Sequence, residues 1–61
     1  GNMEEIVALR QQIAKQQDEL QKLEKRMRRE PQVDIQMQLH QQVKAKRKEV
    51  DNLRKKLEEL K

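Results

Sequence analysis

The sequence predicts an all-α fold, a two-helix antiparallel coiled-coil hairpin. Charged residues make up 43% of the 61-residue chain, which contains a single glycine and a single proline, and this composition is typical of coiled coils. The apolar residues recur at steps of three and four, which indicates amphipathic helices. They form two heptad series that are out of phase across Pro31. Because one straight helix cannot present both series on one face, the chain is expected to turn at about residues 30–34.

The first helix is predicted over residues 3–29. Asn2 can accept hydrogen bonds from first-turn amides, and Glu5 three residues later completes a capping-box-like pair. Gly1 and Asn2 before Met3 are interpreted as a vector remnant. The helix should end before Pro31, because the residue preceding a proline is disfavoured in helical geometry. Its inward-facing series, or seam, is Ile6, Leu9, Ile13, Gln16, Leu20, Leu23 and Met27.

The second helix is predicted over residues 35–59, with Asp34 as its N-cap. Residues 30–34 then form a connection of the usual length for a helical hairpin. The seam of this helix is Leu39, Val43, Lys46, Val50, Leu53, Leu57 and Leu60. Val33, Ile35 and Met37 are expected to cover the end of the seam at the turn.

Two polar seam residues favour the hairpin over a parallel dimer. In a parallel homodimer Lys46 would face its own copy, whereas in the hairpin it lies opposite Leu20 and can reach Glu19. Gln16 is expected opposite Val50. Beside the seam, Glu24 could pair with Arg47 and Glu5 with Lys56. An antiparallel dimer is the alternative, because one thin seam in so short a chain is only marginally stable.

The composition also bears on chemistry. The chain has no cysteine and no aromatic residue, so it offers neither a disulfide framework nor a cysteine-based zinc site. His40 falls beside the seam without other candidate metal ligands, and we interpret it as a solvated rim residue. No catalytic set or phosphate-binding loop is present. We therefore expect no enzyme activity, no cofactor and no metal. Without a secretion signal or an apolar span, an intracellular location is expected, cytoplasmic or nuclear.

Positive charge is concentrated near the turn. Residues 22–48 contain nine Lys/Arg against three acidic residues, a net charge of +6, and the remainder contains six against eight, a net of −2. The hairpin would bring these cations together as a basic patch that suits an acidic partner. Coiled-coil surfaces are also charge-rich without binding anything, so a solvated face is the alternative. The candidate partner-binding residues are Lys25, Arg26, Arg28, Arg29, Lys44, Arg47 and Lys48.

These features predict a non-enzymatic protein-interaction, structural or regulatory module, residues 3–61 forming one segment of a larger protein. In architecture such a hairpin is similar to the finger domains through which effectors bind Rho-family GTPases, and to hairpins that interrupt motor-protein stalks. No motif matches residue by residue, so the resemblance implies no site. One alternative is a homo-oligomerisation scaffold. Another is an electrostatic binder of nucleic acid, an acidic membrane or a small GTPase.

Overall fold

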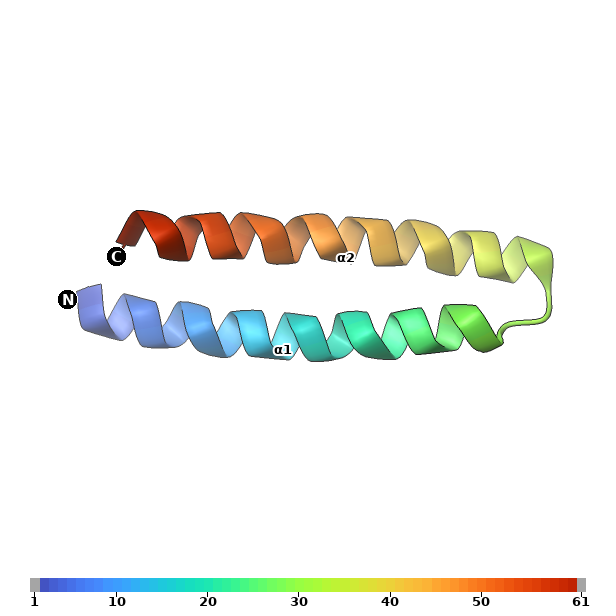
Figure 1. Cartoon of the computed structure of the whole chain (residues 1–61), viewed down its shortest axis with the longest axis horizontal. Coiled ribbons are helices and arrows are strands. Elements are labelled where there is room, and N and C mark those ends of the chain that lie inside the picture. Colours follow the sequence, from blue (N-terminus) through green and yellow to red (C-terminus); the bar gives the residue numbers. More distant parts are fainter. Residues whose placement is uncertain (1, 61) are drawn as a thin grey trace.

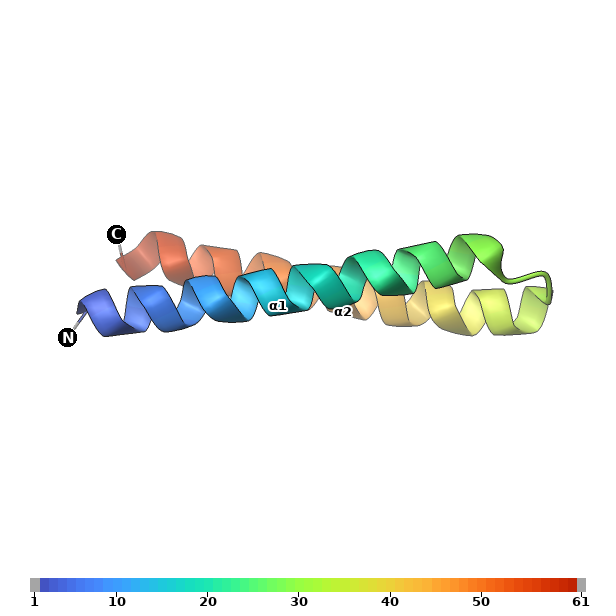
Figure 2. The ribbon, with the colours of Figure 1, turned by 90° about the horizontal axis from the view of Figure 1, so that it is seen from below.

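The computed structural model describes residues 2–60 and confirms the predicted all-α hairpin. Helix α1 spans Asn2–Arg29 and helix α2 spans Val33–Leu60. The helices lie side by side and run in opposite directions (Figure 1). In the perpendicular view of Figure 2 they cross each other near their middles. The molecule is a rod of 47 × 14 × 10 Å, so its apolar interior is the single seam between the two helices.

The seam is formed by both predicted apolar series. Its most buried members are Leu9 and Ile13 of α1 with Leu39, Val43 and Val50 of α2, and Val43 is only 1% exposed. The other series positions are all partly buried: Ile6, Gln16, Leu20, Leu23, Met27, Lys46, Leu53, Leu57 and Leu60. Burial of this apolar stripe is the main favourable contribution to folding, and it is strongest on α2.

The connection between the helices is shorter than predicted. It comprises residues 30–32, and α2 begins at Val33 rather than at Ile35. The cause is a helical hydrogen bond from the Gln36 amide to the Gln32 carbonyl, at 2.9 Å, which makes Gln32 the capping residue. Asp34 therefore lies within the first turn of α2. There its carboxylate favours the positive end of the helix dipole instead of capping the helix.

Helix α1 also begins one residue before the predicted start, because Asn2 is already helical. Glu4 and Glu5 lie in its first turn, and Arg28 and Arg29 lie in its last turn. Acids at the amino end and cations at the carboxyl end both favour the helix dipole. The interpretation of Gly1 as a vector remnant concerns a residue outside the described part of the chain.

Backbone groups freed at the turn find partners. The Met27 carbonyl accepts hydrogen bonds from the Glu30 amide at 3.3 Å and from the Gln36 side-chain Nε2 at 3.1 Å. The Gln32 amide donates to Glu30 Oε1 at 3.1 Å. The Gln36 bond ties the end of α1 directly to the first turns of α2. No residue from 2 to 60 has a positive φ, which agrees with the absence of glycine near the turn.

The expectation that Val33 and Met37 cover the end of the seam is wrong. Ile35 is partly buried, but Val33 is 69% exposed and Met37 is 62% exposed. Because α2 already begins at Val33, the side chains of Val33 and Met37 lie one turn apart on the outside of the helix. They project from the side of the rod instead of folding over its end.

Candidate functional site

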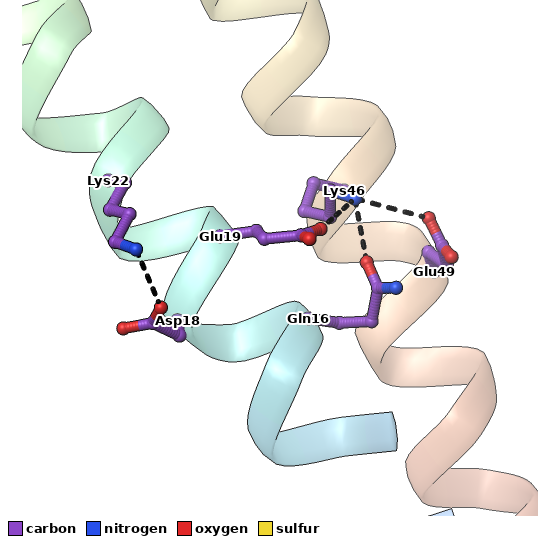
Figure 3. Close-up of polar contacts among 6 residues, drawn as sticks. All are labelled: Gln16, Asp18, Glu19, Lys22, Lys46 and Glu49. Atoms are coloured by element: carbon purple, nitrogen blue, oxygen red, sulfur yellow. Dashed lines mark hydrogen bonds and ion pairs between the residues drawn. The ribbon is translucent and has the colours of Figure 1, made fainter. Parts of the chain in front are cut away.

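A polar cluster interrupts the seam near its middle. The Lys46 ammonium donates to Gln16 Oε1 at 2.6 Å and to Glu19 Oε2 at 3.0 Å. It also lies 3.8 Å from Glu49 Oε2, one turn along its own helix. Figure 3 shows these three acceptors around the one ammonium. Because Gln16 and Glu19 belong to α1, the cluster joins the two helices at one particular position along their length.

The cluster changes the acidity of Glu19. The hydrogen bond from Lys46 and the positive charge of Lys46 lower the pKa of this carboxyl below its ordinary value of 4.5, while burial acts to raise it. The charges of Lys15 and Lys22 also lower this pKa. No buried side-chain nitrogen or oxygen atom lacks a hydrogen-bond partner within the described residues. The polar layer is therefore a satisfied one, which limits its cost to the fold.

The sequence anticipated part of this cluster. The contact between Lys46 and Glu19 was expected and is present. The role of Gln16 was missed, because Gln16 was placed opposite Val50 whereas its amide oxygen accepts from Lys46. The sequence did contain a sign of this contact, because the two polar seam residues occupy neighbouring positions along the seam. A lysine stem is long enough to span the step between them.

The two ion pairs expected beside the seam have different outcomes. Arg47 Nη2 and Glu24 Oε2 are 2.8 Å apart, as expected. Within residues 2–60 no ion pair joins Glu5 to Lys56. Both side chains instead border an open groove at the end of the rod opposite the turn. There they remain in solvent, where an ion pair gains little free energy.

The structure divides the predicted basic patch. Lys25, Arg26 and Arg29 border one shallow depression at the end of α1, together with Lys22 and the acidic Glu30. We call the four cations the basic stripe. They recur at steps of three, one and three, which places them on one side of the helix. Lys22 was not among the candidates, although this spacing is visible in the sequence. Its ammonium also pairs with Asp18 at 3.1 Å (Figure 3).

The remaining candidates lie elsewhere. Arg47 is held by Glu24 beside the seam. Lys44 and Lys48 are exposed one turn apart on α2, and Arg28 is exposed on α1 outside the row of the stripe. The predicted patch is therefore several small surfaces, of which the basic stripe is the most compact.

The described residues also bear on metal binding and on crossing a membrane. His40 is exposed, and residues 2–60 contain no group of three or more potential metal-binding side chains. Neither α1 nor α2 is apolar enough over a sufficient length to cross a membrane. Comparisons with known protein families, curated proteins and solved structures find no match.

Proposed function

We propose that this hairpin is a non-enzymatic protein-interaction module of a larger protein, a coiled-coil rod that docks an acidic surface of a partner protein. The observation that supports this function best is the basic stripe on α1. Its members are exposed, and within residues 2–60 Lys25, Arg26 and Arg29 take part in no ion pair. Their charges are therefore available to a partner.

The position of the stripe favours docking without rearrangement. The stripe lies outside the seam, so a partner can bind while the helices stay packed. It spans about two helical turns, roughly 11 Å. A surface that is ordered before binding loses little conformational entropy when a partner arrives, and this preserves affinity. A partner helix with carboxylates at steps of three and four would match the stripe in charge and spacing.

An acidic protein surface suits the stripe better than a nucleic acid does. The chain contains no aromatic residue, so it cannot stack bases as single-strand binding proteins do. A duplex or a membrane would engage cations spread over a broad face. Here Arg28, Lys44 and Lys48 lie away from the stripe on other parts of the surface.

The test uses three probes: a synthetic helical peptide with glutamates at steps of three and four, a DNA duplex, and vesicles containing phosphatidylserine. Fluorescence anisotropy measures binding of the first two, and co-sedimentation measures binding to the vesicles. We expect the peptide to bind the wild-type chain more tightly than the duplex or the vesicles. Lys25→Gln, Arg26→Gln and Arg29→Gln combined should weaken peptide binding by at least about tenfold.

The control removes the same charge from exposed positions on α2 that lie away from the stripe, by Lys44→Gln, Lys48→Gln and Lys55→Gln combined. This variant should bind the peptide within about threefold of wild type, since only non-specific attraction is lost. Equal losses of peptide affinity in the two variants would show that net charge alone is responsible for peptide binding. That result, or tighter binding of the duplex or the vesicles, would contradict the proposal.

A further inference from the structure

Four large apolar side chains are exposed in a regular arrangement. Met3 is 79% exposed and Val7 50% exposed on α1, and Val33 and Met37 are exposed to a similar degree on α2. Each pair is spaced by four residues and lies in the first two turns of its helix. Because the helices run in opposite directions (Figure 1), the two pairs lie at opposite ends of the rod.

Both pairs lie on the same long side of the rod. In packed helices a step of seven residues returns a side chain to the same side. The separation between Met3 and Glu24 is a multiple of seven residues, and so is the separation between Val33 and Arg47. The ion pair between Glu24 and Arg47 crosses the seam on one side, and so marks the side of Met3 and Val33. Val7 and Met37 follow one turn later. We call this side the Met3/Met37 face.

We propose that a second copy of this chain covers the Met3/Met37 face, with the two rods antiparallel. A two-fold axis across the middle of the rod superposes the open end of one hairpin on the turn end of the other. Met3 and Val7 of each copy then lie at the height of Val33 and Met37 of the other copy. The same contact forms twice, as a symmetric dimer interface requires.

The charge distribution selects the antiparallel orientation. Steps of seven residues from Met3, Val7, Val33 and Met37 assign the charges of this face. Its turn half carries Arg28, Lys44 and Arg47 against Glu24, a net charge of +2. Its other half carries Arg10 and Arg54 against Asp51 and Glu58, a net charge of zero. An antiparallel dimer places each positive half over the neutral half of the other copy, which contains these two acids. A parallel dimer would place the two positive halves together, and like charges facing each other oppose association.

The face is large enough for a specific dimer. Two of the rod's dimensions are 47 and 14 Å. A face of this size offers about 650 Å² per copy, or about 1,300 Å² in total, at the lower end of the range for stable interfaces. The basic stripe remains free, because Arg26 is seven residues from Glu19 and so lies on the side of the Lys46 contact. Dimerisation and peptide docking can therefore be tested independently.

Sedimentation equilibrium on the 61-residue chain tests the dimer. Over protein concentrations from about 10 μM to about 1 mM, the wild-type mass should rise from 7.4 kDa towards twice this value. Combined Val7→Glu and Met37→Glu should raise the dissociation constant by at least about tenfold, because unpaired charges would be buried. The control, Ala8→Glu with Gln38→Glu, adds the same charges one residue along each helix, on another side. It should dimerise like wild type. Circular dichroism checks that all variants remain helical.

Single-cysteine variants test the orientation, since the chain has no cysteine of its own. Met3→Cys and Val33→Cys are mixed and treated with a bismaleimide that spans about 10 Å, which is close to the distance between packed helix axes. The mixture should give a cross-linked dimer of the two variants. Each variant alone should give none, because identical positions lie at opposite ends of an antiparallel dimer.

Several results would overturn the proposal. They are a wild-type mass that stays at 7.4 kDa, a control variant that weakens dimerisation as much as the Val7→Glu and Met37→Glu variant does, and cross-linking of Met3→Cys to itself. A monomeric chain that binds phosphatidylserine vesicles through Val33 and Met37 would assign the face to a membrane instead. None of these results depends on the basic stripe, so they leave the proposed docking function to be tested by its own experiment.

Discussion

At the scale of single residues, the most consequential contact is the one that Lys46 makes across the seam. A lysine in the seam is costly if its ammonium loses water without gaining partners. Here the ammonium gains an amide oxygen and a carboxylate from the opposite helix. Sliding one helix by a turn would separate Lys46 from both acceptors. The cluster therefore favours one register of the hairpin over its shifted alternatives.

Replacing Glu19 by glutamine should make the stability of the hairpin less dependent on pH. The pKa of Glu19 is lower in the folded chain than its ordinary value of 4.5. Its ionised form therefore stabilises the fold above that value, and this stabilisation is lost as the pH falls through the lowered pKa. Urea denaturation should show wild type more stable than Glu19→Gln at pH 7, with the difference shrinking towards about pH 3.

The matching control for this prediction is Asp51→Asn. Asp51 is exposed on α2 and makes no ion pair within residues 2–60. Its replacement should leave a much smaller difference from wild type at pH 7. A Glu19→Gln variant whose difference from wild type is the same at both pH values would contradict the assignment to the Lys46 contact.

A second prediction at this scale concerns the bond between Gln36 and the Met27 carbonyl. Gln36→Ala removes the side-chain donor at 3.1 Å and should lower the free energy of unfolding by about 1 kcal/mol. Gln38→Ala removes the same side chain from an exposed site on the same helix, and so corrects for the higher helix propensity of alanine. Urea denaturation of both variants measures the difference. Equal stabilities would show that this bond contributes nothing.

At the scale of the helices, burial along the seam is uneven. Leu39 and Val50 are nearly as buried as Val43, whereas Leu53, Leu57 and Leu60, towards the end of α2 away from the turn, are only partly buried. Helices packed through a single seam gain most of their stability from the few side chains that are fully removed from water. The stability of the hairpin should therefore depend most on the part of α2 from Leu39 to Val50.

Truncation of the Val43 side chain should accordingly lower the free energy of unfolding more than the same change at a surface position. Val43→Ala removes two methyl groups from the most buried site and should lower the free energy of unfolding by about 2 kcal/mol. Val33→Ala makes the same change at an exposed site and should change stability by less than about 0.5 kcal/mol. Thermal or urea unfolding at low concentration, where the chain is monomeric, compares them. A similar cost at both positions would mean that the seam is not the stabilising core.

The sequence predicted the helices well and their junction less well. The change of phase at Pro31 was sufficient to predict the hairpin, because periodicity reports which side of a helix is apolar. The start of α2 was misplaced because Asp34 is a strong capping residue, while Gln32 caps the helix through its backbone carbonyl, which carries no side-chain signal. The same error placed Val33 and Met37 over the seam instead of on the outer surface. For the basic patch, the sequence shows that cations are concentrated near the turn. It does not show which of these cations form ion pairs with neighbouring acidic residues.

At the scale of the whole molecule, the rod is asymmetric along its length. One end carries the turn and most of the positive charge, and the other carries the acidic first turn of α1 and the end of α2. The outer sides also differ: the basic stripe lies on the side of the Lys46 contact, and the Met3/Met37 face lies on the side of the Glu24 contact. A small rod can therefore offer distinct surfaces to different partners while its interior stays unchanged.

The beginning of α1 and the end of α2 lie at the same end of the rod, away from the turn (Figure 1), and this determines how the hairpin responds to tension. A force applied to the chain on either side pulls the helices apart from that end, so apolar layers break one after another instead of sharing the load. The first layers, near Ile6 and Leu60, are only partly buried and should part at low force. Rupture then has to pass Lys46 and Val43 before the turn is reached, which places the main mechanical barrier halfway along the rod.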